Sequence, residues 1–419
     1  MHNNYNNTEI QSKLLKALIG DDVDLMLNDD PLEHEMILNM GPSHPSTHGV
    51  LRIVLKLDGE VVVNSILDIG YLHRGIEKIA ENTTYHGFIP YSDRLDYLAP
   101  LSNNVALVLA IEKLADIKAP PRAQYIRTIL CELARISSHL MALGSIGIDL
   151  GALTYWFYTF TEREKLYDIF DLIVGARFTT SYTRIGGVAN DITNEGIVAI
   201  RQFLSKIPSI LKKCEQLINR NKIFIERTKD VGKISLEDAI DIGLTGANLR
   251  ACGSSKDLRK DSPYLIYPEL DFNVPYYNDG DSLARFMIRI DEIMESLKIV
   301  KQALDKLPSG EVMLNDSKKV FPRKEKIYTK MEDLISNFML VNFGMQPPVG
   351  EIYHAIESPK GELGFYIISD GSGYPWRLKI KSPSFSNLQA LPTLLKGAMI
   401  SDVVAIIGSI DPIMGECDK

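Results

Sequence analysis

Cysteine is scarce in this 419-residue chain. The four cysteines, Cys131, Cys214, Cys252 and Cys417, lie far apart, and no two of them form a C-x-x-C pair. Iron–sulfur clusters and structural zinc sites need closely spaced thiolates, and disulfides need an oxidising compartment. The sequence therefore predicts a chain that holds no metal cluster of its own and does not depend on disulfides.

Positive charge is also in short supply, because 46 Lys and Arg stand against 54 Asp and Glu, a net charge of −8 with His neutral. Without a run of Lys and Arg there is little counterion release to drive nucleic-acid binding, so no nucleic-acid partner is expected. No apolar run reaches about 18 residues, the length that spans a bilayer. Residues 1–9 lack the basic-then-apolar pattern of a signal peptide. We therefore expect a cytoplasmic protein that does not itself cross the membrane.

The common catalytic and nucleotide-binding signatures are missing as well. No G-x-G-x-x-G segment opens a helix after a strand, and no P-loop, G-x-S-x-G or H-E-x-x-H segment occurs. These absences exclude the simplest assignments to dinucleotide-binding enzymes, P-loop nucleotidases, serine hydrolases and zinc proteases. Any chemistry has to come from polar residues that belong to none of these motifs.

The apolar pattern predicts an α+β protein, a long-helix bundle flanked by small β-sheets from the N- and C-terminal parts. Residues 50–63 alternate around Asp58-Gly59, the turn signal of a tight hairpin. Helical spacing is found over residues 103–115, 121–144, 157–174, 193–221 and 281–307, and short strands return over residues 350–380. We expect a polar arm over residues 1–35, with a short helix at 12–19, and a single domain over 36–419. That domain would comprise a β-hairpin region (36–66), a helical core (67–345) and a C-terminal β and helix region (346–419).

Two histidines stand just before the predicted hairpin, in the segment GPSHPSTHG at residues 41–49. His44 and His48 are four residues apart, but Pro42 and Pro45 prevent the helix that would turn both toward one metal. A metal site is therefore not expected here. The residues alone leave two interpretations open, a functional loop or a structural loop whose imidazoles satisfy buried backbone groups.

Three further polar segments accompany this loop. They are YLHRGIEK at residues 71–78, which contains Arg74; YSDRLDYL at residues 91–98, which contains Arg94, Asp96 and Tyr97; and the long helix with His139, followed by Asp149. Each also has an ordinary explanation: a solvated helix face, a capped helix start with a salt bridge, or charge pairs three and four residues apart. From the residues alone, the prediction stops at a polar pocket between a hairpin loop and a helix bundle.

Taken together, these motifs resemble the quinone-site subunit of respiratory complex I, the D-subunit family of NADH:quinone oxidoreductases. The resemblance covers nearly the whole chain. It also includes PPRAQYIR (120–127), DLGALT (149–154), RIGGV (184–188), GELGFY (361–366) and SDVVAIIGSIDPIMGECD (401–418). It implies a subunit of a proton-translocating enzyme, active only in the assembled complex, in which quinone is reduced to quinol.

That family is similar in fold to the large subunit of nickel–iron hydrogenases, which hold their metals with two C-x-x-C pairs. In this chain Ile413 and Glu416 stand where the C-terminal pair would place thiols, Cys417 comes one position late, and the N-terminal pair is missing. Nickel and iron have no ligand set without those thiolates. The resemblance therefore implies that the former metal cavity is free to accept a quinone head group.

Carried over position by position, the resemblance assigns His48 and Tyr97 to hydrogen-bond the two quinone carbonyls, and Asp149 to pair with His48. Residues that match the quinone pocket or the surroundings of the terminal cluster are His44, Arg74, Arg94, Asp96 and His139. An imidazole with an ordinary pKa near 6.5 is a ready proton donor, and a phenol near 10 is a weaker donor that has to be reprotonated. One departure is Leu67-Asp68, where the family often has Pro-His. A proton-relay role at that position is therefore not carried over.

The resemblance also implies cofactors and partners. This chain would bind no cofactor alone: quinone is the substrate, a [4Fe-4S] cluster belongs to the neighbouring subunit, and NAD binds in another subunit. Expected partners are the terminal iron–sulfur subunit, the C-subunit homologue, other peripheral-arm subunits and the membrane-arm subunits. The expected location is peripheral, on the cytoplasmic side of the cell inner membrane. An energy-converting hydrogenase-type large subunit and a non-catalytic scaffold are the alternatives, and the residues do not distinguish ubiquinone from menaquinone.

Overall fold

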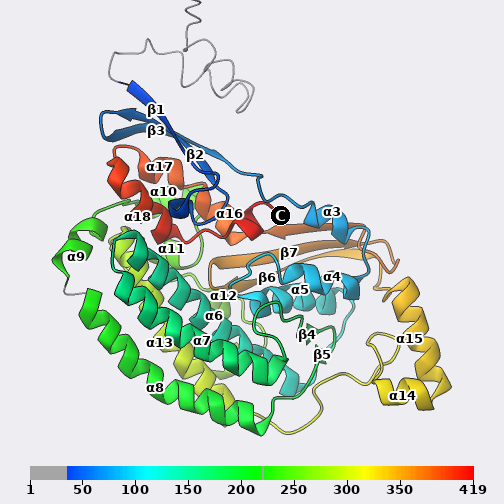
Figure 1. The fold of residues 1–419 in the computed structure, drawn as a ribbon. Coiled ribbons are helices and arrows are strands. Elements are labelled where there is room, and N and C mark those ends of the chain that lie inside the picture. The colour runs from blue at the N-terminus through cyan, green and yellow to red at the C-terminus, as the bar shows by residue number, and fades with distance from the viewer. Residues whose placement is uncertain (1–34, 219–220) are drawn as a thin grey trace, which may run out of the picture.

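The computed structural model describes residues 35–218 and 221–419. Except for Glu35, the predicted polar arm and its short helix lie outside the described residues. The described chain is an α+β protein, as predicted, with a bundle of long helices and small antiparallel sheets in its N- and C-terminal parts (Figure 1).

The predicted β-hairpin is confirmed and belongs to a larger sheet. Strands β2 (Arg52–Asp58) and β3 (Val61–Asp68) pair around Gly59, whose φ of 59° is the left-handed conformation that glycine tolerates. A third strand, β1 (Glu35–Met40), pairs with the other edge of β2. The sequence did not predict β1, because its apolar residues do not alternate with polar ones.

The bundle is built around α6, which packs against α5, α7 and α13. The long helices are α5 (Pro100–Leu114), α6 (Pro121–Asp149), α7 (Leu153–Val174), α8 (Asn194–Ile218) and α13 (Ser282–Asp305). All five were predicted to within a few residues. The largest difference is at the end of α6, which runs past Gly144 as far as Asp149.

By length and composition alone, α6 is also the one helix in the described part of the chain that is apolar enough to cross a membrane. The sequence was expected to contain no such segment. In the structure, 89% of the apolar window is buried inside the protein, and core helices of soluble proteins pass the same test.

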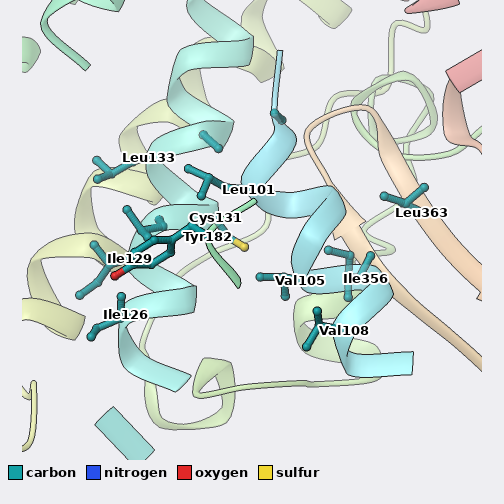
Figure 2. Close-up of a cluster of buried hydrophobic side chains, with 14 of the residues drawn as sticks. Leu101, Val105, Val108, Ile126, Ile129, Cys131, Leu133, Tyr182, Ile356 and Leu363 are labelled. Atoms are coloured by element: carbon teal, nitrogen blue, oxygen red, sulfur yellow. The ribbon is translucent and has the colours of Figure 1, made fainter. Parts of the chain in front are cut away.

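The C-terminal sheet packs against α5 of the bundle through β6 and β7. Its strands are β6 (Gly350–Ser358), β7 (Gly361–Ser369) and β8 (Arg377–Lys381), with β7 in the middle. Figure 2 shows the core that joins the layers: Leu101, Val105 and Val108 from α5; Ile126, Ile129 and Leu133 from α6; and Ile356 and Leu363 from the sheet. A second apolar cluster holds the N-terminal sheet against α17 (Leu391–Leu395) and α18 (Ile400–Ile410).

Short elements connect these layers. They are η2 (Pro45–Thr47), α3 (Ile76–Ala80), α4 (Tyr85–Ser92), β4 (Thr183–Arg184), β5 (Gly187–Val188), α9 (Lys222–Thr228), α10 (Leu236–Ile242), α11 (Ala247–Arg250), α12 (Leu258–Asp261), η3 (Tyr267–Glu269), α14 (Lys324–Thr329), α15 (Met331–Phe343), α16 (Pro383–Leu388) and α19 (Met414–Cys417). Of these, α11 is a single helical turn.

Candidate functional site

The histidine loop at residues 41–49 is fixed by its own hydrogen bonds. His44 caps η2, because its Nδ1 accepts from the backbone N–H of Ser46 at 3.2 Å. The hydroxyl of Thr47 lies within hydrogen-bond distance of the carbonyls of His44 and Gly49, at 2.8 and 2.9 Å. His48 follows with a φ of 54° and ends the turn. The loop is thus ordered by local contacts that leave the His48 ring available for another partner.

That partner is Asp149, the last residue of α6. His48 Nε2 lies 2.7 Å from Asp149 Oδ2, and the two side chains are only 14% and 11% exposed. A charge-assisted hydrogen bond of this length in a mostly buried position is among the stronger polar contacts in proteins. Gly408 of α18 makes room for the pair, since a Cβ there would lie 2.9 Å from Asp149 Oδ2 and 3.4 Å from His48 Nε2.

Tyr97 lies in the segment between α4 and α5. Its ring packs against Phe178 with the ring centroids 6.3 Å apart. Burial raises the pKa of the phenol, and the negative charges of Asp96 and Asp411 raise it further. The phenol therefore holds its proton at neutral pH and is a hydrogen-bond donor.

The C-terminal segment brings the histidine loop and the tyrosine segment to one place. Met414 contacts the first, since a Cβ on Gly49 would lie 3.0 Å from Met414 Cγ. Gly415 contacts the second, since a Cβ there would lie 2.6 Å from the carbonyl oxygen of Leu95 and 3.3 Å from Tyr97 Cδ1. Two consecutive residues of α19 therefore touch the two segments that carry His48 and Tyr97.

Comparison with known proteins agrees with these motifs. Residues 149–419 match the family described as "Respiratory-chain NADH dehydrogenase, 49 Kd subunit". The chain is 61% identical to an NADH-quinone oxidoreductase D subunit of Chloroherpeton thalassium over 391 residues, 93% of this chain and 89% of the relative. It is 54% identical to the NADH-quinone oxidoreductase D subunit of Salinibacter ruber, over 93% of this chain and 87% of that protein. The same identity holds with the Methylacidiphilum infernorum protein, over 93% of each chain.

The chain belongs to the D-subunit family of NADH-quinone oxidoreductases. Two of the other residues that the resemblance to this family assigned to the site lie beside α19. Arg74 donates from Nη2 to the carbonyl oxygens of Arg94, at 2.8 Å, and Gly415, at 3.3 Å. Arg94 in turn donates to the carbonyl of Pro90 at the end of α4. These arginines tie the tyrosine segment to the C-terminal segment.

His139 lies elsewhere, inside the bundle. It is fully buried on α6, ten residues before Asp149, which is about 15 Å along a helix. Its Nε2 lies 2.7 Å from Glu292 Oε2 of α13. Burial lowers the pKa of His139 to about 4 despite this acidic neighbour, so the ring is neutral at physiological pH.

Asp68, the residue that departs from the family pattern, has local partners at the end of β3. Its Oδ2 accepts from Arg52 Nη1 at 3.2 Å and from the hydroxyl of Tyr71 at 2.9 Å. These contacts form a small ion-pair cluster at the edge of the N-terminal sheet.

Sequence reasoning missed a buried ionic group next to Tyr97. Lys360, in the turn between β6 and β7, contacts the carboxylate of Asp411 at the end of α18, and both are almost fully buried. Glu416 of α19, counted in the sequence only as a replaced thiol, is fully buried nearby. The signal that pointed to this group was the presence of Asp411 and Glu416 in an otherwise apolar C-terminal segment.

The described residues contain no group of three or more His, Cys, Asp or Glu side chains arranged to hold a metal ion. Ile413, where a thiol would stand in a hydrogenase, is buried. All four cysteines are buried and free. Because apolar surroundings raise the pKa of a thiol, the buried Cys417 stays protonated.

Proposed function

We propose that this chain is the subunit of an NADH-quinone oxidoreductase that, with a neighbouring iron–sulfur subunit, forms the site where the quinone head group is reduced to quinol. One observation carries the proposal: the His48–Asp149 pair and Tyr97 are held by the same C-terminal segment, at Gly408 and Gly415. Membership of the D-subunit family supplies the reaction class.

The residue types suit the reaction. Reducing a quinone to a quinol adds two electrons and two protons, so each carbonyl oxygen needs a hydrogen-bond donor that can also deliver a proton. His48 uses Nε2 toward the carboxylate of Asp149, which leaves Nδ1 as the ring nitrogen for a quinone carbonyl. The contact with Asp149 also orients the His48 ring and fixes which ring nitrogen faces the carboxylate.

Tyr97 would serve the second carbonyl. Its raised pKa keeps the phenol protonated in the resting state, so that its O–H can donate, and makes its phenolate a strong base once the proton has left. A turnover through Tyr97 therefore requires a nearby acid that restores the phenolic proton.

The surroundings of Tyr97 support a site that another subunit completes. The cavity that Tyr97 lines together with Phe178 and Leu98 measures about 10 Å³, the space of roughly one water molecule. A site for an organic ligand usually measures hundreds of cubic ångströms. We propose that the head-group pocket is completed by the neighbouring iron–sulfur subunit, which covers the face carrying Arg74 and Arg94.

Electrons in this scheme come from the [4Fe-4S] cluster of that neighbour, and the NAD-binding site lies in another subunit. Arg74 and Arg94 offer fixed positive charge beside α19, which favours the reduced state of a cluster placed there. His44 caps η2 and would act by holding the histidine loop. His139 would act only through the buried network inside the bundle, because it is neutral and enclosed.

The remaining partners follow from the same proposal. They are the C-subunit homologue, other peripheral-arm subunits and the membrane-arm subunits, on the cytoplasmic side of the cell inner membrane. The competing function as a hydrogenase large subunit lacks its ligand thiols, since Ile413 and Glu416 stand at their positions.

The test is quinone reduction by assembled complexes carrying Tyr97→Phe or His48→Ala. We expect each change to lower NADH:quinone activity by about 100-fold or more, the usual contribution of a proton donor. Electron transfer from NADH to an artificial acceptor ahead of the quinone site should persist. Tyr328→Phe is the matched control, because Tyr328 is 86% exposed on α14. Full quinone turnover with both site variants would support a non-catalytic scaffold instead.

A further inference from the structure

Two carboxyl groups lie buried beside Tyr97, those of Asp96 and of Glu416 in α19. The segments that carry them pack directly, since a Cβ on Gly415 would lie 2.6 Å from the carbonyl oxygen of Leu95. In each carboxyl group, one oxygen accepts a hydrogen bond. Asp96 Oδ1 accepts from the backbone N–H of Leu98 at 2.9 Å, and Glu416 Oε1 accepts from the backbone N–H of Ser384 at 2.9 Å. The other oxygens, Asp96 Oδ2 and Glu416 Oε2, are buried and have no hydrogen-bond partner.

Positive charge around this carboxyl pair is limited. Lys360 interacts with both acids but already contacts Asp411. Arg163 of α7 interacts electrostatically with Asp96, and Arg289 of α13 lies 4.0 Å from Asp411. The remaining titratable neighbours are the Tyr97 phenol and the Cys417 thiol, and both are neutral at physiological pH because their pKa values are raised.

The two acids therefore cannot both ionise easily. Burial raises the pKa of both carboxyls, and the nearby charge of Asp96 helps to raise the pKa of Glu416 to about 8. Two interacting buried carboxyls retain one proton between them at neutral pH, as in other carboxyl dyads. A buried carboxylate oxygen without a partner would cost far more folding free energy than the same oxygen in a neutral carboxyl group. A proton held by the pair therefore makes it possible for oxygens without a partner to lie in the core.

We infer that Asp96 and Glu416 share one proton and return it to Tyr97 after that residue has protonated the reduced quinone. This inference rests on the proposed function. Asp96 is the strongest electrostatic neighbour of the Tyr97 phenol and directly precedes it in the chain. The carboxyl pair is thus the acid that a phenolate at Tyr97 requires.

The steps balance in protons and electrons. Once the quinone has been reduced with electrons supplied by the neighbouring subunit, its oxygen takes the phenolic proton. The O–H bond of Tyr97 breaks with its electron pair left on the phenolate oxygen, and one O–H bond of the quinol forms. The neutral carboxyl of the pair then gives its proton to the phenolate and restores Tyr97. The pair is left doubly ionised and takes one proton from water. No residue of this chain is oxidised or reduced.

The experiment compares assembled wild-type complex with Glu416→Gln and Asp96→Asn, and uses Glu332→Gln as the control because Glu332 is exposed on α15. Infrared difference spectra between pH 6 and pH 9 report the carbonyl stretch of protonated carboxyl groups. We expect a band that titrates in the wild type and the control and is lost or shifted in both site variants. Quinone reductase rates should fall roughly tenfold in Glu416→Gln, with a steeper loss at alkaline pH, because water has to reprotonate Tyr97.

The outcomes separate this inference from the function on which it rests. An unchanged band in Glu416→Gln and Asp96→Asn, or a normal rate and pH profile in Glu416→Gln, overturns the proton-sharing role even if Tyr97→Phe abolishes quinone reduction. If instead Tyr97→Phe and His48→Ala retain full quinone turnover, the proposed function fails, and the band alone then shows a protonated pair without a catalytic task. A further loss in the Tyr97→Phe/Glu416→Gln double variant beyond that of Tyr97→Phe also contradicts the inference, because the pair acts through Tyr97.

Discussion

Replacing Gly408 by alanine tests how tightly the His48–Asp149 pair is held. The added Cβ would lie 2.9 Å from Asp149 Oδ2, closer than real Cβ atoms come to an oxygen, and 3.4 Å from His48 Nε2. The carboxylate end of Asp149 has to move, and the 2.7 Å contact to His48 is weakened or lost. A hydrogen bond to a charged group contributes about 1.5–3 kcal/mol.

The same change favours the helix, because alanine in a helix interior is more stable than glycine by about 1 kcal/mol. The opposing terms leave the fold close to neutral or slightly destabilised, by at most about 2 kcal/mol. The activity has no such compensation, since helix propensity does nothing for proton delivery. If the transition state loses the full free energy of this hydrogen bond, the rate of quinone reduction falls by about 10- to 150-fold, because about 1.4 kcal/mol corresponds to a factor of ten in rate.

The assay is NADH:quinone activity of the assembled Gly408→Ala complex, with the amount of this chain in the complex measured alongside. Gly196→Ala in α8 is the matched control, because its Cβ would be about as crowded, 2.8 Å from Ile173 Cγ1 and 3.2 Å from the hydroxyl of Thr193, but the nearest atoms belong to neither His48 nor Asp149. We expect normal assembly in both variants and lost activity only in Gly408→Ala. Wild-type kcat and KM in that variant would refute the view that the position of Asp149 controls His48.

Two further predictions concern stability. Burial lowers the pKa of His86 to about 4, so the unfolded chain binds the imidazole proton at a higher pH than the folded chain does. The contribution of the neutral His86 to the free energy of unfolding is therefore fully present above pH 6.5. It falls by about 3 kcal/mol as the pH drops toward 4. Both ring nitrogens of His86 are buried without a hydrogen-bond partner, so phenylalanine can replace the ring without losing a bond. His86→Phe should therefore reduce the drop in the thermal inactivation temperature between pH 7.5 and pH 5. An unchanged drop would mean that His86 is solvated in the native protein. Lys360→Met removes the partner of Asp411 and should cost about 3–5 kcal/mol, seen as less of this chain in purified complex. Asp411→Asn in the same chain should recover part of the loss, and no recovery would show that Lys360 acts through packing alone.

Local patterns predict most of the architecture. The Asp58-Gly59 turn and the helical spacing indicate the hairpin and all five long helices. The same patterns place the end of α6 too early, because Gly144 resembles a helix stop. In the structure, Gly144 and Gly147 allow α6 to pack closely against α7. A Cβ at Gly144 would lie 2.5 Å from Thr159 Oγ1, and a Cβ at Gly147 would lie 2.8 Å from Tyr155 Cδ1. A glycine needed for packing between helices cannot be told from a helix terminator by sequence pattern alone.

Charge pairing was predicted less well, because it depends on tertiary contacts. Pairing of neighbouring charges along α6 was one of the ordinary explanations for its polar residues, and Arg135 does lie 3.3 Å from Glu132. Arg127, however, pairs with Glu112 of α5 at 2.7 Å. The His48–Asp149 pair joins residues 101 positions apart. Its prediction came from the resemblance to the D-subunit family, since no local rule links a loop histidine to the end of a distant helix.

Glu416 stands where the resemblance to hydrogenases would place a thiol. Its carboxyl group is fully buried, and one of its oxygens has no hydrogen-bond partner. An ionised carboxyl at that depth would require a dedicated cation, and Lys360 is already engaged by Asp411. A carboxyl group is tolerated at this depth because it can become neutral by binding a proton, and burial raises the pKa of Glu416. In the proposed mechanism, this C-terminal segment keeps a proton next to the Tyr97 phenol, which has to be reprotonated at each turnover.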